Sequence, residues 1–364
     1  MATIKRIGVL TGGGDCPGLN AVIRAVTKTA INEYGVEVVG FRDGFKGLVE
    51  NDYVPLDLRA VSGIAHLGGT ILGTTNRDNP FNFHRVINGQ DHFSDRSQEA
   101  IANMEKLGLG GLVVIGGDGS LNIAYRFYQM GVPVVGVPKT IDNDLSATDI
   151  TFGFYTAVTT ASEALDKLHT TAESHHRVMI LEVMGRYAGW IALYAGLSGG
   201  ADVILIPEIP YHIEAVVKKI RQRHQQTKKF SIIVVAEGAA PVGGEMVVQK
   251  LVPTSHDPIR LGGIGNQLAE QIEEITGIET RVTVLGHLQR GGQPIPYDRI
   301  LATRYGVAAT ENLIEGNVGV MVSLQGTRIT TVPLQEAVKE IRKVPLDSDM
   351  IRAAKAVGIS FGAE

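Results

Sequence analysis

The residue types best suited to phosphate chemistry stand directly after two short apolar runs. Ile7–Leu10 leads to three consecutive glycines at 12–14, and Val113–Ile115 leads to Gly-Gly-Asp-Gly-Ser over 116–120. Glycines at a strand end let backbone N–H groups approach an oxyanion, and a helix that begins there adds positive potential. A plain tight turn is the alternative for either loop alone. Two such loops in one chain favour a phosphate or nucleotide site.

Asp118 is flanked by glycines on both sides, which distinguishes the second loop from the first. A carboxylate in this setting can hold Mg²⁺, directly or through water, while the glycines admit phosphates. The alternative is that Asp118 caps the helix that follows.

A third cluster, Pro138–Asp144, follows another apolar run. Its carboxylates, Asp142 and Asp144, are two residues apart and can point into one site, where one binds a metal and the other takes a proton. Lys139 and Thr140 supply donors for phosphoryl oxygens, which phosphoryl transfer requires. The alternative is a loop of Asx turns with solvated acids.

Basic residues lie beside apolar runs in the second half of the chain. Arg177 and Arg281 each precede a run, Arg186 follows one, and His287 and Arg290 lie in a loop after another. The planar guanidinium group suits phosphate. Taken singly, a surface ion pair is the more ordinary role for an arginine, and a structural hydrogen bond for His287.

Two kinds of element must position these clusters. Short runs rich in Val and Ile are typical of strands buried on both faces of a parallel sheet; they are Ile7–Leu10, Leu112–Ile115, Val132–Val137, Val178–Val183, Val203–Ile206, Ile232–Ala236, Val282–Leu285 and Val320–Leu324. Segments with helical spacing lie between them, at Asn20–Ile31, Gln98–Leu107, Asn122–Gln129, Ala157–His169, Ile213–Gln226, Asn266–Ile275 and Arg299–Ile314. This alternation predicts an α/β fold. The stretch Pro241–Ile264 has no clear hydrophobic period and is interpreted as an excursion from the α/β fold.

Composition excludes several classes of protein. The chain has 364 residues, 34 Lys and Arg against 38 Asp and Glu, and one Cys. A net charge of −4 argues against binding nucleic acid through general positive charge, and one cysteine excludes a disulfide framework. No run reaches the roughly 18 apolar residues of a membrane span, and the start lacks the pattern of a signal peptide. We therefore expect a cytoplasmic protein with no nucleic-acid or membrane partner.

Taken together, the motifs resemble those of the 6-phosphofructokinase family. LTGGGDCPGLN, IGGDGS, PKTIDND, EVMGRYAG and VLGHLQRGG stand in the family's order between about residues 5 and 346. A sequence like IGGDGS also occurs in diacylglycerol and NAD kinases, whereas PKTIDND followed by GHLQRGG is highly specific. Pro241–Ile264 adds length relative to the short bacterial members, and Arg77 stands one residue later than in them.

The resemblance implies a kinase that transfers the γ-phosphoryl group of ATP to the 1-hydroxyl of D-fructose 6-phosphate, with Mg²⁺ as cofactor. It also implies two Rossmann-like three-layer α/β domains with mainly parallel sheets, between which the chain crosses more than once. Residues 1–153 and 290–339 would form the nucleotide-binding domain. Residues 154–289 and 340–364 would form the sugar-phosphate-binding domain.

Each residue that matches a motif takes an implied role. The nucleotide site would contain Gly14, Arg77, Asp78, Gly117, Asp118, Gly119, Ser120 and Lys139, and the magnesium ion would lie between Asp118 and Asp144. Asp142 would accept the proton of the sugar hydroxyl, while Thr140 and Arg186 stabilise the moving phosphoryl group. The sugar phosphate would contact Thr140, Ile141, Asp142, Arg177, Met184, Gly185, Arg186, Glu237, Arg281, His287, Leu288, Gln289 and Arg290. Arg177 and Arg281 would come from a neighbouring subunit of an allosteric homotetramer.

Two residues indicate different phosphoryl donors. Gly119 leaves room for the α-phosphate and nucleoside of ATP, at a place where an aspartate excludes them in the pyrophosphate-dependent branch. The lysine at position 139 resembles the residue that the pyrophosphate-dependent branch has there. Steric exclusion outweighs an additional ammonium group, which either donor tolerates, so we expect ATP. The alternatives are a pyrophosphate-dependent phosphotransferase and a regulator that binds nucleotide and sugar phosphate without catalysis.

Overall fold

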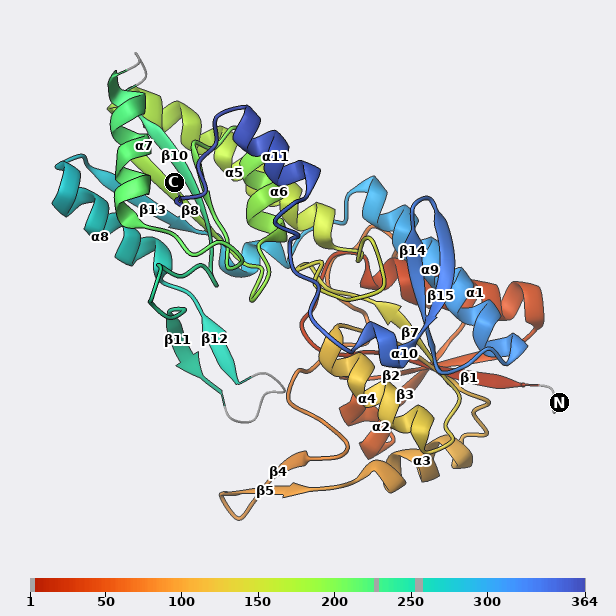
Figure 1. Cartoon of the computed structure of the whole chain (residues 1–364). Helices are drawn as coiled ribbons and strands as arrows, with labels where there is room; N and C mark the ends of the chain where they lie inside the picture. Colours follow the sequence, from red (N-terminus) through yellow and green to blue (C-terminus); the bar gives the residue numbers. More distant parts are fainter. Residues whose placement is uncertain (1–3, 226–228, 253–257, 364) are drawn as a thin grey trace.

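The computed structural model describes residues 4–225, 229–252 and 258–363. The chain forms two α/β parts that lie side by side, each built on its own sheet (Figure 1). The sheets have seven and four strands, and two separate hairpins project from the parts.

The larger sheet has a parallel centre with an antiparallel strand at each edge. Its order is β15-β14-β7-β6-β1-β2-β3, and the strands are β1 (Arg6–Thr11), β2 (Glu37–Phe41), β3 (Tyr53–Leu56), β6 (Leu112–Gly116), β7 (Val134–Pro138), β14 (Val320–Gln325) and β15 (Arg328–Pro333). β3 pairs with β2, and β15 with β14, in antiparallel register. The parallel centre places the ends of β1, β6 and β7 next to one another at one edge of the sheet.

Helices cover both faces of this sheet. They are α1 (Leu19–Tyr34), α2 (Phe45–Glu50), α3 (Ser97–Lys106), α4 (Asp118–Gln129), α9 (Pro296–Glu315) and α10 (Leu334–Ala337). Alternate residues of β1 enter different cores, because Ile7 and Val9 pack in the cluster that contains α1 and α9, whereas Leu10 packs in the cluster that contains α2, α3 and α4. Burial on both faces explains why the central strands are continuous apolar runs.

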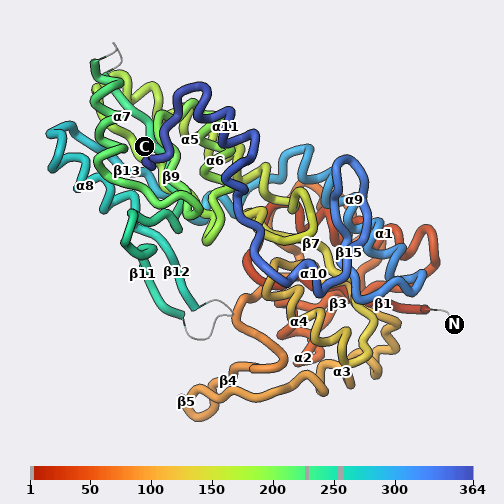
Figure 2. Tube along the Cα trace, in the orientation of Figure 1, coloured from red at the N-terminus to blue at the C-terminus, as the bar shows by residue number. Residues whose placement is uncertain are grey.

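The smaller sheet is parallel throughout, in the order β13-β8-β10-β9. Its strands are β8 (Val178–Val183), β9 (Val203–Leu205), β10 (Ser231–Ala236) and β13 (Thr280–Val284). The accompanying helices are α5 (Phe154–His175), α6 (Trp190–Ser198), α7 (Ile213–Gln225), α8 (Ile264–Thr276) and α11 (Asp349–Ala356), with a short 3₁₀ turn, η1 (Gly286–Gln289). β14 and β15 return to the larger sheet and α11 to the smaller part, so the chain crosses more than once (Figure 2). The boundaries predicted for the domains stay a prediction.

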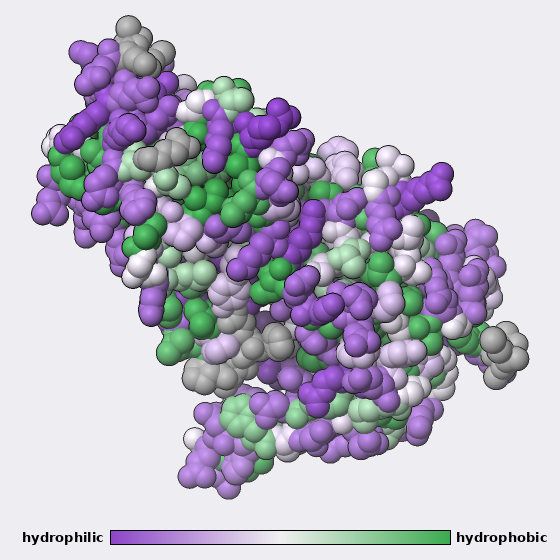
Figure 3. Space-filling view, in the orientation of Figure 1, coloured by the Kyte–Doolittle hydropathy of each residue, from purple (hydrophilic) through white to green (hydrophobic). Residues whose placement is uncertain are grey.

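One hydrophobic cluster extends from the larger sheet to the smaller one. It joins Val113 of β6 to Leu181 of β8 through residues such as Phe152 and Phe154, which are fully buried. Because interiors are close-packed, this continuous core holds the two sheets at one relative position. The outer surface on the face drawn in Figure 3 is mostly hydrophilic, with apolar residues scattered over it.

Every strand and helix expected from the sequence is present, with shifts of a few residues at the ends. α5 begins at Phe154 rather than Ala157 and continues to His175, since residues in the left-handed conformation end it on both sides, Gly153 and His176. The expected strand at Val282–Leu285 begins at Thr280 instead, where β13 enters register with β8. Residue 226, at the end of the expected Ile213–Gln226 helix, lies outside the described residues.

Several elements have no counterpart in the predicted set. α6 is apolar all round and buried, so it shows no amphipathic period. The other elements absent from the prediction are α2, α10, α11, β2, edge strands β3 and β15, the hairpin of β4 (Phe83–Ile87) and β5 (Gln90–Ser94), and the hairpin of β11 (Val248–Leu251) and β12 (Ile259–Leu261). The second hairpin lies within Pro241–Ile264. Within the described part of the chain, no helix combines the length and apolar character that a membrane span requires.

Tyr305 of α9 supports the segment that follows the acidic loop. Its side chain is fully buried, and its hydroxyl donates to the carbonyl oxygen of Ile150 at 2.6 Å and lies 3.1 Å from Oγ1 of Thr148. Next along the chain, Thr151 donates through its hydroxyl to the carbonyl oxygen of Thr140, 2.7 Å away. The acidic loop is therefore held from α9.

We predict that Tyr305→Phe lowers the free energy of unfolding by about 1–2 kcal/mol, because the partly buried Ile150 carbonyl loses its short hydrogen bond from the buried hydroxyl. Chemical denaturation followed by fluorescence measures this. Tyr34→Phe is the control, since Tyr34 is 39% exposed, and it should change little. Equal stabilities of Tyr305→Phe and wild type would show that the hydroxyl does not support the loop.

Candidate active site

A cleft of about 1030 Å³ opens where the carboxyl ends of the two sheets face each other. Loops after β1, β6 and β7 line one side, and loops after β8, β10 and β13 line the other. Ligands of open α/β sheets bind at such strand ends. The residues predicted from the sequence that line this cleft are Gly14, Arg77, Asp78, Gly117, Asp118, Gly119, Ser120, Lys139, Thr140, Asp142, Met184, Arg186, Glu237, His287 and Arg290.

Two glycines of the first loop lie close to side chains from other loops. A Cβ on Gly12 would lie 2.5 Å from Oγ of Ser120, and one on Gly14 would lie 2.7 Å from a guanidinium nitrogen of Arg290. Oγ1 of Thr74 donates to the carbonyl oxygen of Gly13 at 2.6 Å, so the next loop fixes this one. The first two contacts join loops that are far apart in the sequence.

The second loop forms the N-terminus of α4. The capping residue is Gly117 and the helix begins at Asp118, so the alternative in which Asp118 caps the helix is wrong. The first N–H groups of a helix lack partners within it and carry partial positive charge. Gly117 to Ser120 all line the cleft. This end of α4 therefore suits an anion.

Lys139 lies below the first loop and is only 4% exposed. Its ammonium group donates to the carbonyl oxygen of Gly14. Burial lowers the pKa of Lys139, and the positive charge of Arg290 also lowers it, whereas Asp142 favours the charged form. The side chain places a cationic group between the glycine loop and the acidic loop.

The acidic loop is buried, which rules out solvated acids there. Asp142 is 3% and Asp144 5% exposed. Within the described residues, Oδ1 of Asp142 is buried and has no hydrogen-bond partner. Asn143 adopts a left-handed φ of 52° and accepts through Oδ1 from the Thr151 N–H at 3.0 Å. Asn143 thus turns back into the fold while Asp142 faces the cleft.

Arg186 and Glu237 come from neighbouring strand ends in the smaller sheet. The backbone N–H of Arg186 donates to Oε1 of Glu237 at 3.0 Å. Arg186 has a left-handed φ of 51°, an unfavourable conformation for a residue with a side chain, and such positions often serve function. The guanidinium lies 3.8 Å from Oδ1 of Asp118, across the cleft. Arg186 therefore links the two sides.

The loop after β13 closes the other side of the cleft. His287 and Arg290 line it, and a guanidinium nitrogen of Arg290 donates to the carbonyl oxygen of Asp15 at 3.2 Å. Gln289 is fully buried and accepts through Oε1 from the Met184 N–H at 2.8 Å. Gln289 therefore positions the strand end that carries Met184.

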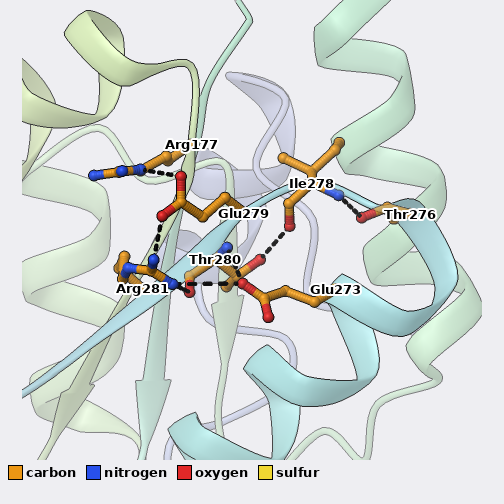
Figure 4. A network of polar contacts seen from close by, with 7 residues as sticks. All are labelled: Arg177, Glu273, Thr276, Ile278, Glu279, Thr280 and Arg281. Carbon is orange, nitrogen blue, oxygen red and sulfur yellow. Dashed lines mark hydrogen bonds and ion pairs between the residues drawn. The ribbon is translucent and has the colours of Figure 1, made fainter.

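Arg177 and Arg281 lie outside the cleft, on either side of Glu279 (Figure 4). Nε of Arg177 is 2.6 Å from Oε2 of Glu279, and Arg281 pairs with the other oxygen of the same carboxylate. Arg281 also lies 3.6 Å from Glu273. The hydrogen bond from Arg177 holds the pKa of Glu279 below its usual value, with further support from both positive charges. The structure thus collects both arginines in one exposed cluster away from the cleft.

Five other predicted residues do not line the cleft. Ile141 packs in the core, Gln289 and Asp144 are buried, Gly185 precedes Arg186 in the turn with a φ of 144°, and Leu288 is 68% exposed. Asp144 lies behind the cleft wall. Burial raises the pKa of Asp144, and the negative charges of Asp142 and Asp118 raise it further.

The acids fit a magnesium ion that also binds phosphate. Mg²⁺ usually takes one or two carboxylates and completes its shell with water and substrate phosphates. Asp118, which lines the cleft, and buried Asp144 would supply the carboxylates, and the unpartnered oxygen of Asp142 would add an acceptor. In the part of the chain that the structure describes, no group of three or more His, Cys, Asp or Glu side chains is arranged for a metal ion. The ion would therefore depend on the phosphates.

Sequence reasoning missed part of the lining. Phe45 and Ile123 supply apolar surface on the side of the larger sheet, and Gln249, Lys250, Ile259, Arg260 and Asn266 supply polar and apolar surface on the other side. Phe45 and Ile123 read as core residues in the sequence. Glu182 was detectable, since it is a charged residue inside the apolar run Val178–Val183 and its side chain is buried.

The parts assembled here are those of phosphoryl transfer between two bound molecules: glycine loops and a helix N-terminus for phosphate, buried acids, and an arginine that spans the cleft. The family model for phosphofructokinase matches residues 6–313. The chain is 56% identical to ATP-dependent 6-phosphofructokinase 2 of Clostridium perfringens, over 99% of both chains. The chain belongs to the phosphofructokinase family.

Two further relatives bear on the donor and the fold. The chain is 52% identical to the pyrophosphate–fructose 6-phosphate 1-phosphotransferase of Streptomyces coelicolor, over 98% of this chain and 100% of that protein. The solved phosphofructokinase of Saccharomyces cerevisiae is similar with a TM-score of 0.79 and 33% identity, over 92% of this chain and 45% of that longer chain. The expected α/β fold and family are confirmed, whereas the role of each site residue stays a prediction.

Glu237 provides a test of the charge balance in the cleft. Burial raises its pKa to about 7, and the negative charge of Asp142 adds to this. Because the folded state binds this proton more tightly than the unfolded state, its contribution to stability is present below about pH 4.5 and is lost as pH rises to about 7.

We predict that Glu237→Gln gains thermal stability relative to wild type as pH rises from about 4.5 to about 7, with a constant difference above that. The amide oxygen of glutamine still accepts from Arg186. Melting temperatures across this range measure the effect, with exposed Glu245→Gln as control. A difference that does not depend on pH would contradict the prediction.

Proposed function

We propose that the protein transfers the γ-phosphoryl group of ATP to the 1-hydroxyl of fructose 6-phosphate, giving fructose 1,6-bisphosphate and ADP. The observation that carries the proposal is the buried, unpartnered oxygen of Asp142 at the junction of the two cleft halves. It would act as a proton acceptor between a glycine-lined side that binds phosphate and an arginine-lined side that binds the sugar. The names of the close relatives agree with this reaction.

Asp142 would accept the proton of the sugar 1-hydroxyl as the hydroxyl oxygen attacks the γ-phosphorus. The bond between that phosphorus and the bridging oxygen breaks, and its electron pair leaves with ADP. This step requires a base beside the attacking hydroxyl and an anion-binding site for the leaving phosphates. Asp142 and the end of α4 supply them from neighbouring loops.

The negative charge of the moving phosphoryl group would be stabilised from both sides of the cleft. Arg186 reaches across from the smaller sheet, and Thr140 and Lys139 lie on the side of the larger sheet. Preorganised donors aimed at developing charge usually provide the largest part of catalysis. Asp118 and Asp144 would hold Mg²⁺, whose positive charge offsets that of the phosphates when it is bound.

The sugar would lie against the strand ends of the smaller sheet. His287 and Arg290 would bind its 6-phosphate, and Met184 and Glu237 would contact the ring. Arg177 and Arg281 do not line this cleft, so we propose that they serve the sugar site of a neighbouring subunit in a homotetramer. A cytoplasmic location stays a prediction.

A pyrophosphate-dependent phosphotransferase is the second candidate. Lys139 favours it, since the ammonium group lies beside the glycine loop where pyrophosphate would bind, and one relative carries that name. Gly119 favours ATP, since it leaves space at the start of α4 for the remainder of the nucleotide. Turnover of fructose 6-phosphate with Mg·ATP and with Mg·pyrophosphate separates the two candidates, and ATP should give the higher kcat/KM.

Replacing Asp142 by Asn should remove the base and keep the shape. We expect kcat to fall by about 10²–10⁴-fold with little change in substrate affinity. Coupled assays of product formation and calorimetric binding of both substrates measure this. A variant that keeps more than about a tenth of wild-type kcat would exclude Asp142 as the base.

Replacing Gly119 by Asp should place a carboxylate where the nucleotide must lie. We expect kcat/KM with ATP to fall at least about tenfold more than any activity with pyrophosphate, because the new charge and volume act on the α-phosphate. Gly119→Ala is the control for a side chain without charge. Equal losses with both donors would contradict this role of Gly119.

Complementation between inactive variants tests the shared sugar site. Arg281→Ala should raise the KM for fructose 6-phosphate and leave that for the nucleotide nearly unchanged. Mixed oligomers of Arg281→Ala and Asp142→Asn chains should regain activity, since one site then combines an intact Asp142 with an intact Arg281. Native mass spectrometry verifies that subunits exchange. Exchange without recovery would show that each site is complete within one chain.

A further inference from the structure

We propose that the β11–β12 hairpin is a wall of the active cleft, where Lys250 and Arg260 bind the phosphate groups of a substrate. The inference rests on the proposed function and adds residues that the sequence motifs do not contain. Gln249, Lys250, Ile259, Arg260 and Leu261 all line the cleft, together with the base of the hairpin at Gly262 and Gly263. The hairpin extends from the smaller part toward the β4–β5 hairpin of the larger part (Figure 1).

The base of the hairpin is fixed to a strand that carries site residues. Glu182 of β8 is 2% exposed, and its two carboxylate oxygens accept from the N–H groups of Gly263 at 2.9 Å and Gly265 at 2.8 Å. These N–H groups stand at the start of α8, where a negative charge is stabilised. Two residues after Glu182, the same strand leads into Met184 and the turn to Arg186. The hairpin is therefore held in register with the sugar side of the cleft.

Two basic residues of the hairpin lie opposite each other. Lys250 and Arg260 are direct partners in the antiparallel register. Like charges opposite each other on a pair of strands destabilise it, and a two-stranded hairpin has little stability to lose. No ion pair of Lys250 occurs among the residues that the structure describes, and Lys250 is exposed. An anion in the cleft would offset the positive charge of Lys250.

Phosphate is the anion that the cleft is built to receive. The end of α4, Arg186 and Arg290 line the same cleft, so the hairpin adds two cations to a site already suited to phosphate. Both substrates of the proposed reaction carry phosphate, and Lys250 and Arg260 line the cleft in which both would bind. The interaction is electrostatic and part-exposed, so salt should weaken it.

Calorimetric binding of Mg·ATP and of fructose 6-phosphate, each alone, tests whether the hairpin binds the phosphate of either substrate. Lys250→Ala should weaken the affinity for one of them by about 3- to 10-fold at low salt, and the effect should shrink at high salt. Lys250→Arg should keep wild-type affinity. Lys218→Ala, on the exposed face of α7, removes the same charge outside the cleft and should change neither affinity. The ligand that responds identifies whose phosphate the hairpin binds.

The inference is overturned if Lys250→Ala and the double variant with Arg260→Ala both bind each ligand within twofold of wild type. Unchanged melting temperatures show that a loss of affinity is not a loss of folding, and rescue by Lys250→Arg gives a second check. Turnover by the wild-type protein tests the proposed function separately. A protein that binds these ligands through the hairpin without turnover would keep this inference and refute the proposed function.

Discussion

Parallel strand pairing determines where the side chains at the strand ends of the cleft lie. β1, β6 and β7 run parallel in one sheet, and β8, β10 and β13 do so in the other, so their loops emerge at common edges. Parallel pairing requires helices on both faces, and these bury the strands as continuous apolar runs. The hydrophobic cluster shared by the two sheets then sets their edges opposite each other. The cleft is a consequence of this packing.

Burial of charge at the base of the cleft follows from the same packing. Burial lowers the pKa of Lys139 and raises that of Glu237 to about 7, so both charged forms are disfavoured before a substrate arrives. Groups with such shifts cluster at functional sites. Bound phosphates would stabilise the ammonium group of Lys139.

The central strands and the clusters after them could be predicted from the sequence, since burial on both faces and loop glycines leave a direct signature. The buried helix α6 and edge strand β3 could not, because one lacks an amphipathic period and the other is short and partly exposed. Asp142 was accessible from its motif, whereas Lys250 and Arg260 enter the cleft only through the β11–β12 pairing. Glu182 could be noticed in the sequence, because it is a charged residue within an apolar run. Its hydrogen-bond partners, the N–H groups at the start of α8, are visible only in the folded structure.

In the proposed reaction, Asp142 faces the sugar hydroxyl across from a nucleotide at the end of α4. A crystal structure of the wild-type protein with fructose 6-phosphate and a non-hydrolysable ATP analogue tests it most directly. The account predicts the 1-hydroxyl within about 2.6–3.2 Å of a carboxylate oxygen of Asp142, and the γ-phosphate between Gly117–Ser120 and Arg186. A sugar bound with its 1-hydroxyl away from Asp142, or a nucleotide outside the loops after β1 and β6, would contradict it.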